Sequence, residues 1–199
     1  TLRAAMRIED GDVENAITDL RSALREQPDS SKATLLLARA HEMNGAVELA
    51  DDRFDAAFKM AGGDARSALQ YAQFLTRRGN HKRAGEILSR SMRVSPNSQP
   101  LLIALAQVRL RQKDWKGAEE IANKLKALNK DNTISDQILG RAFAGQKDFD
   151  KSMESFQKAF QNVPDGVNSL VAMVRLQVSQ GRTEEAKKLL SDILAEKPE

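Results

Sequence analysis

The side chains in this sequence that could carry acid–base or metal chemistry are two histidines and a few pairs of carboxylates. His41 and His81 lie far apart, and neither has a serine, a cysteine or a metal-ligating partner at a local ligand spacing. Carboxylate pairs such as Asp51-Asp52, Glu119-Glu120 and Glu184-Glu185 each fall near the start of a predicted helix, where negative charge offsets the helix dipole. We therefore expect no catalytic residue, no metal site and no cofactor, and we expect the protein not to be an enzyme.

The Gly62-Gly63 pair is a candidate phosphate-binding turn, because backbone N–H groups of glycine-rich turns can bind phosphate. No predicted strand precedes this pair, and no GxxxxGK sequence follows it. We expect the two glycines to end a helix instead, in place of a helix-ending proline.

The composition indicates an all-α protein that is folded through most of its 199 residues, since 41% of the side chains are hydrophobic and the common residues lose little freedom in a helix. The formal charge of +3 is small for this length, so we expect no nucleic-acid partner.

No apolar run is long enough to span a bilayer. The absence of cysteine suits a bacterial periplasm, reached with an export signal or lipid anchor removed before Thr1, as well as a cytoplasm.

The strongest pattern is a repeat of 34 residues without insertions. Prolines mark the period, because Pro96, Pro164 and Pro198 are separated by multiples of 34 and Pro28 lies 68 residues before Pro96. Two columns of mostly small residues share this period. They are Ala4, Ala38, Ala72, Ala106, Gly140 and Val174, and Ala16, Ala50, Ala84, Ala118, Ser152 and Ala186.

Small side chains at this spacing predict pairs of antiparallel helices, because two helices approach closely only where small residues lie at the crossing. Large apolar residues beside these columns are expected to fill the space around each crossing. They are Leu37, Tyr71, Leu105, Leu139 and Met173 in the first helices, and Leu20, Phe54, Leu88, Phe156 and Leu190 in the second. The fourth repeat departs from this pattern, with Ala122 at a large position and Leu125 at a small one.

The turn inside each pair is marked by Gly45, Gly79 and Gly181, whereas Lys113-Asp114-Trp115 and Lys147-Asp148-Phe149 occupy it in two repeats. Trp115 and Phe149 could form a platform for a ligand. Because they begin the second helix of a pair, we interpret them as packing residues between neighbouring pairs.

These columns resemble the tetratricopeptide repeat family, which has small residues at motif positions 8 and 20, an apolar residue at 24 and proline at 32. The resemblance covers the whole chain and implies a right-handed α-solenoid superhelix of antiparallel helix pairs. The implied repeats are residues 1–30 (partial), 31–64, 65–98, 99–132, 133–166 and 167–199. Leu190 and Leu194 near the end lack a following helix to cover them, which predicts a piece of a longer solenoid or, alternatively, a homodimer through uncovered ends.

In this family the first helices line a concave groove. The motif positions that face into the groove imply a row of long polar side chains there. The residues at motif position 9 of successive repeats form the centre of this row, and they are Arg39, Gln73, Gln107, Arg141 and Arg175. The implied residues are Lys32, Arg39, Arg66, Gln73, Arg77, Gln107, Arg111, Gln137, Arg141 and Arg175. Arginine and glutamine donate several hydrogen bonds, and we expect few acids to compete with them, so the row favours an anionic or amide-rich partner.

The function that we predict is therefore a non-catalytic scaffold that holds an extended peptide or a partner helix in its groove. The stretches Gly11-Asp12 to Ala16-Ile17 and Pro28-Asp29-Ser30 also resemble bacterial repeat lipoproteins, which implies a periplasmic assembly factor for exopolysaccharide or protein export as an alternative. Binding of RNA or another polyanion ranks last, because the groove positions hold almost no aromatic residue on which bases stack.

Overall fold

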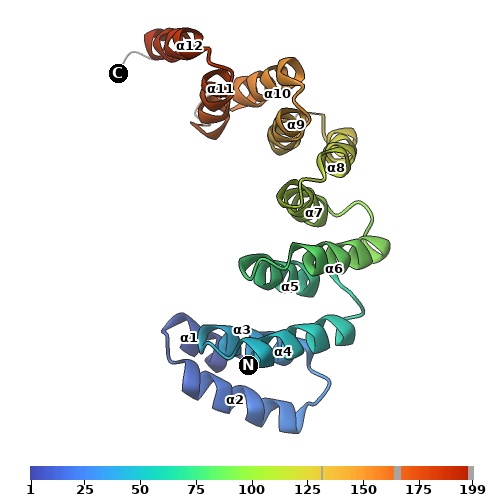
Figure 1. Ribbon diagram of the computed structural model, residues 1–199. Coiled ribbons are helices and arrows are strands. Elements are labelled where there is room, and N and C mark those ends of the chain that lie inside the picture. The colour runs from blue at the N-terminus through green and yellow to red at the C-terminus, as the bar shows by residue number, and fades with distance from the viewer. Residues whose placement is uncertain (131, 164–166, 197–199) are drawn as a thin grey trace. The chain divides into compact units, whose positions relative to one another are not determined.

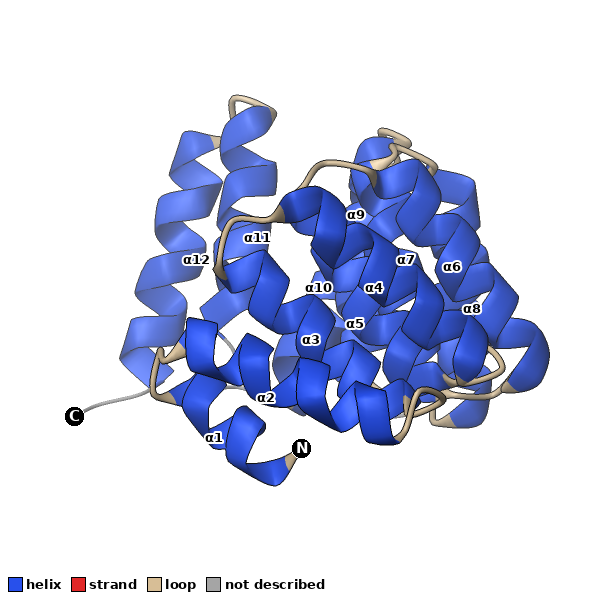
Figure 2. Cartoon of the chain, turned by 90° about the horizontal axis from the view of Figure 1, so that it is seen from below, coloured by secondary structure: helices blue, strands red, loops and turns tan. Residues whose placement is uncertain are grey.

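The computed structural model describes residues 1–130, 132–163 and 167–196, and every regular element within these ranges is an α-helix (Figures 1 and 2). The described helices are α1 (Leu2–Glu9), α2 (Val13–Glu26), α3 (Ser31–Met43), α4 (Val47–Met60), α5 (Ala65–Arg77), α6 (His81–Val94), α7 (Gln99–Arg111), α8 (Trp115–Leu128), α9 (Thr133–Gly145), α10 (Phe149–Asn162), α11 (Val167–Ser179) and α12 (Thr183–Glu196). None of them is long and apolar enough to cross a membrane. The predicted all-α architecture of consecutive helix pairs is confirmed.

The chain forms two compact units, an N-terminal unit of residues 1–101 and a C-terminal unit of residues 102–199. Within the N-terminal unit α1 packs on α2, α2 on α3, α3 on α4, α4 on α5 and α5 on α6. Within the C-terminal unit the same succession joins α8 to α12. Within each of these two successions a helix contacts its neighbours along the chain, as in a solenoid.

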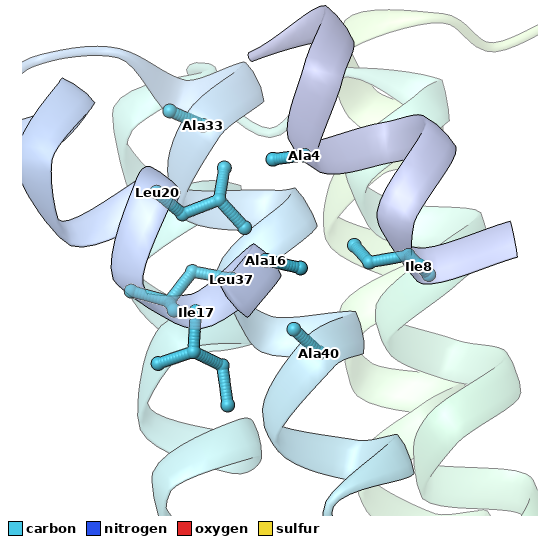
Figure 3. Close-up of a cluster of buried hydrophobic side chains, with 8 residues drawn as sticks. All are labelled: Ala4, Ile8, Ala16, Ile17, Leu20, Ala33, Leu37 and Ala40. Atoms are coloured by element: carbon cyan, nitrogen blue, oxygen red, sulfur yellow. The ribbon is translucent and has the colours of Figure 1, made fainter. Parts of the chain in front are cut away.

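The first core cluster shows how a helix pair packs against the next helix (Figure 3). It is built from small and branched apolar side chains of three helices, all of them buried. They are Ala4 and Ile8 of α1, Ala16, Ile17 and Leu20 of α2, and Ala33, Leu37 and Ala40 of α3. The pair α1–α2 thus buries its apolar face against the first helix of the following pair.

The two columns of small residues lie at the helix crossings, as predicted. Each member of the second column is at most 3% exposed, and so is each alanine of the first column. Gly140 is buried too, while Val174 is half-buried. At one crossing the Ser152 hydroxyl donates a hydrogen bond to the Gly140 carbonyl oxygen over 2.8 Å, so α9 and α10 meet nearly backbone to backbone.

The large apolar residues beside the crossings are buried, with one exception. Leu190 is 38% exposed and Leu194, one turn later, is 72% exposed, as expected for side chains that no following helix covers. In the described chain no later helix lies against α12, so one face of that helix contacts solvent. In α8 the small Ala122 stands at a position where the repeat has a large residue, and Leu125 stands where it has a small one. Both side chains are fully buried, so Leu125 fills the volume that Ala122 leaves.

The turn inside each helix pair places one residue in the left-handed region of backbone space. Gly11, Gly45, Gly79 and Gly181 have φ between 74° and 79°. Lys113 and Lys147 stand in the same column and adopt the same conformation, with φ of 60° and 64°. A side chain with a Cβ is strained there, so the two lysine turns carry a conformational cost that the glycine turns avoid.

Polar side chains cap the starts of several helices. Ser30, Asp64, Asn80, Asp114, Asn132 and Asp148 each accept a hydrogen bond from a backbone N–H of the first turn of the following helix. Pro28 and Pro96 follow the ends of α2 and α6, while Pro164 and Pro198 lie outside the described residues. Gly62 and Gly63 both have positive φ after α4, which confirms their predicted role as a helix end.

Trp115 and Phe149 behave differently. A Cβ on Gly145 would lie 2.3 Å from the Trp115 ring, so α8 rests its indole directly on the backbone of α9, as the packing interpretation predicts. Phe149 is 36% exposed, and its predicted burial between pairs is wrong. Ser179 stands one repeat after Gly145 and carries a side chain, so the space that accepts Trp115 has no counterpart there.

We predict that Gly140→Ala destabilises the C-terminal unit. The added Cβ would lie 2.6 to 2.7 Å from ring atoms of Phe156, which is itself buried. Overpacking costs about 1–3 kcal/mol, more than the gain of about 1 kcal/mol in helix propensity. Urea unfolding followed by circular dichroism measures the difference. The double variant Gly140→Ala with Phe156→Leu should recover much of the loss, and an unchanged single variant would contradict this account of the crossing.

We also predict that Lys113→Gly stabilises the C-terminal unit by about 1 kcal/mol, because it relieves the left-handed lysine. The matched control is Lys116→Gly, which lies in the first turn of α8 and should cost up to about 1 kcal/mol through helix propensity. Thermal unfolding of both variants decides the matter. Two changes of the same sign would show that the turn is not strained.

Candidate partner-binding grooves

A polar groove runs between α3 and α5 of the N-terminal unit, and we name it the α3–α5 groove. It consists of two adjoining depressions of about 590 and 300 Å³ that share Arg39 and Gln70. The first is also lined by Glu42, Met43, Phe54, Gln73 and Arg77, and the second by Ser31, Lys32, Leu35, Leu36, Ala61, Asp64, Arg66 and Ser67. The structure thus brings together all five groove residues predicted in this unit, namely Lys32, Arg39, Arg66, Gln73 and Arg77.

Gln70 is the residue of this groove that the sequence analysis missed. Its side-chain oxygen is buried without a hydrogen-bond partner, although the side chain lines both depressions. A buried polar atom in this state costs free energy until a donor reaches it. One signal could have revealed Gln70, because it is the only polar residue in the column Leu36, Gln70, Ala104, Ile138 and Ala172.

The expectation of few competing acids needs correction. Glu42 lines the groove and accepts two hydrogen bonds from the Arg77 guanidinium, at 2.9 and 2.7 Å, so the charge of Arg77 is already matched. Asp64 also lines it but caps α5 through the backbone N–H of Ser67. Within the described residues no ion pair forms to Lys32, Arg39 or Arg66, so these three side chains carry the free positive charge of the groove.

The C-terminal unit has a depression of about 580 Å³ between α9 and α11. Arg141 and Arg175 of the predicted row both line it, together with Asn168, Val171 and the Trp115 ring. Trp115 therefore serves packing and also forms part of the wall of this depression, which we name the Arg141–Arg175 pocket. An aromatic ring beside two guanidinium groups offers stacking and charge in one place.

The remaining predicted groove residues lie elsewhere in the C-terminal unit. Gln137 of α9 donates a hydrogen bond to the Ser169 hydroxyl over 3.2 Å, so it joins α9 to α11. Gln107 and Arg111 are exposed on α7 and do not line the depressions described above. The position-9 residues therefore meet in two pairs, Arg39 with Gln73 and Arg141 with Arg175.

The carboxylate pairs take structural roles. Asp51 accepts a hydrogen bond from the Tyr71 hydroxyl at 2.8 Å and forms an ion pair with Arg83, so it links α4, α5 and α6 and does more than offset a helix dipole. Burial raises the pKa of Tyr71 far above its usual value, and its hydrogen bond to Asp51 adds to the rise. Glu119 accepts a hydrogen bond from Gln146, and Glu184 pairs with Lys187. Among the described residues, no three His, Asp or Glu side chains converge in a way that could hold a metal ion.

His41 is buried at 4% exposure in α3. Its Nδ1 has no hydrogen-bond partner. Burial lowers the pKa of His41, and the charges of Arg21 and Arg53 lower it further. The imidazole is therefore held in its neutral form at physiological pH.

Comparisons of the sequence with protein families agree with this architecture. The family model described as "Cytochrome c-type biogenesis protein H TPR domain" matches residues 2–135, and a tetratricopeptide repeat model matches residues 143–199. The chain belongs to the tetratricopeptide repeat family. This family membership confirms the resemblance drawn from the small-residue columns, and it fits a protein-interaction scaffold.

Solved structures of other tetratricopeptide repeat proteins share the fold. A tetratricopeptide repeat protein from Parabacteroides merdae superposes with a TM-score of 0.82 at 15% identity, covering 99% of this chain and 78% of its own. PilW, a widely conserved type IV pilus biogenesis factor, gives 0.74 at 16% identity over 98% and 90% of the two chains. MamA from Desulfovibrio magneticus RS-1 gives 0.70 at 18% identity over 83% and 93%. No curated protein matches the sequence.

The buried His41 generates a prediction about acid stability. Its folded-state pKa lies below the ordinary value of 6.5, so the unfolded chain takes up the proton first as pH falls. The stability contributed by the neutral imidazole is complete above pH 6.5 and decreases below it. We expect wild type to lose more urea resistance than His41→Gln between about pH 7.5 and 5.5. Parallel losses in the two proteins would show that His41 does not titrate on unfolding.

Proposed function

We propose that this protein is a non-catalytic scaffold that holds an extended, acid-bearing segment of a partner protein in the α3–α5 groove. The observation that carries the proposal is the unpartnered side-chain oxygen of Gln70, which lines both halves of a groove bordered by free cations. An extended peptide has backbone N–H groups without partners of their own, and one of them would satisfy this buried oxygen once the Gln70 side chain turns toward the groove.

The rest of the groove complements such a segment. Lys32, Arg39 and Arg66 line one stretch of it and attract carboxylates, and arginine can bind a carboxylate with two parallel hydrogen bonds. Leu35, Leu36 and Phe54 form apolar parts of the lining, where an apolar side chain of the partner would lose contact with water. Gln73 adds a second amide beside Arg39. These groups match the mixed polar and apolar character of a peptide site.

Our second candidate is a narrower role. The protein would be an assembly factor of the bacterial cell envelope that supports export of exopolysaccharide or protein. This role is favoured by what two relatives are named for, since one matching family belongs to cytochrome c-type biogenesis and PilW is a type IV pilus biogenesis factor. Both roles use the same groove, because an assembly factor must also hold segments of other proteins.

The direct test selects peptides from a random phage-displayed library against the wild-type protein and measures their affinities by fluorescence anisotropy. Gln70→Leu should weaken the selected peptides by about five- to tenfold, because it removes one hydrogen bond of about 1 kcal/mol. The same change should leave thermal stability equal or higher, because it removes a buried oxygen that lacks a partner. This opposite effect on binding and stability separates a binding role from a structural one.

Arg39→Glu should weaken acidic peptides by about tenfold or more, through loss of a charged hydrogen bond and new repulsion. Lys82→Glu is the matched control, since Lys82 is exposed on α6 and does not line the groove. Selected peptides that bind wild type, Gln70→Leu and Arg39→Glu equally would show that the groove is not the site.

A further inference from the structure

A further depression in the N-terminal unit, of about 510 Å³, combines positive charge with an apolar floor. It lies among α2, α3 and α4, and each helix contributes leucine together with a basic or imidazole side chain. The lining residues are Leu24, Arg21 and Arg25 of α2, Leu37 and His41 of α3, and Leu49 and Arg53 of α4. We name it the arginine pocket.

The arginines of this pocket lack the carboxylate partners that four other arginines of the unit have. Arg3 and Arg7 pair with Asp19, Arg77 with Glu42, and Arg83 with Asp51. In the described ranges no ion pair forms to any of the three pocket arginines, and no acid lines the pocket. Arg25 donates a hydrogen bond to the Ser22 hydroxyl at 3.1 Å.

This arrangement opposes folding by itself. Arg21 and Arg25 are four residues apart on one helix, where like charges are mutually destabilising. Arg53 adds a third positive charge across the pocket, and the buried His41 offers an imidazole whose Nδ1 lacks a partner. Leu49 is 46% exposed at the same place. Uncompensated cations around exposed apolar surface are the features of a surface that is completed by another molecule.

We propose that the arginine pocket is a second docking surface, which binds an acidic amphipathic segment of a partner protein. Carboxylates of that segment pair with Arg21, Arg25 and Arg53, and its apolar side chains cover Leu24 and Leu49. Charge complementarity identifies the occupant as acidic, and the leucines on all three helices require apolar side chains beside the acids. A simple anion would leave those leucines in water.

The arginine pocket is separate from the α3–α5 groove. No residue lines both surfaces. On α3 the groove residues Leu35 and Arg39 each precede the pocket residues Leu37 and His41 by two positions, which is a rotation of about 200° around the helix. The two surfaces therefore use opposite sides of α3, and one protein can hold two partner segments at once.

The test uses the full chain and a fluorescein-labelled peptide of glutamate and leucine arranged with a helical repeat, measured by fluorescence anisotropy. Arg21→Glu with Arg53→Glu should weaken binding by about tenfold or more, and the neutral pair Arg21→Gln with Arg53→Gln should fall between this variant and wild type. The same comparison is repeated in the background of the groove variant Arg39→Glu with Arg66→Glu, which removes binding of acidic peptides to the α3–α5 groove. A loss caused by Arg21→Glu with Arg53→Glu in this background reports the arginine pocket alone, which distinguishes failure of this inference from failure of the proposed function. Circular dichroism verifies that each variant is folded.

The matched control is Lys82→Glu with Arg93→Glu, which makes the same change in net charge on exposed positions of α6. It should alter affinity by no more than about twofold, since exposed charges away from the site are screened by salt. Equal losses in the control and in the pocket variant would overturn the proposal. It would also be overturned if the peptide fails to bind wild type, or if the pocket arginines are needed for binding to phosphatidylglycerol vesicles and not for binding to the peptide.

Discussion

The close approach of two helices at each small-residue crossing is the constraint on which the rest of this structure depends. At the α9–α10 crossing, Ser152 reaches the Gly140 carbonyl directly, and the Phe156 ring fills the space that a Cβ on Gly140 would occupy. A crossing this tight leaves little freedom in helix register. Because the same columns recur along the chain, each helix pair presents its neighbours with the same apolar face, and the core grows by repetition.

Because the buried positions alone maintain this packing, the residues at exposed positions can change without altering the fold. In α3, Ala38 and Leu37 satisfy the crossing, while Arg39 and Lys32 contribute only to the surface. Side chains of the two kinds alternate around the helix within a few residues. The scaffold therefore tolerates a change of partner without a change of fold, and the neighbours of low identity that share this fold are consistent with that independence.

The two surfaces that we assign to partners each carry departures from local rules. Gln70 and His41 each keep a buried polar atom without a hydrogen bond, and Arg21 and Arg25 repel each other on one turn of α2. Elsewhere in the same unit Asp51 meets both Tyr71 and Arg83. Natural proteins accept such local costs mainly where function requires them.

The sequence by itself determined the helices, their pairing and nearly all of the core. Helical spacing is a local property of the sequence, and the same 34-residue pattern recurs in every helix pair. It also predicted that Lys32, Arg39 and Gln73 share one surface. Only the tertiary structure decided that Glu42 neutralises Arg77, that Gln70 joins the groove, and that Arg21 and Arg53 meet around His41. These contacts join side chains from different helices, and their distances follow from how the helices pack, which no repeat period encodes.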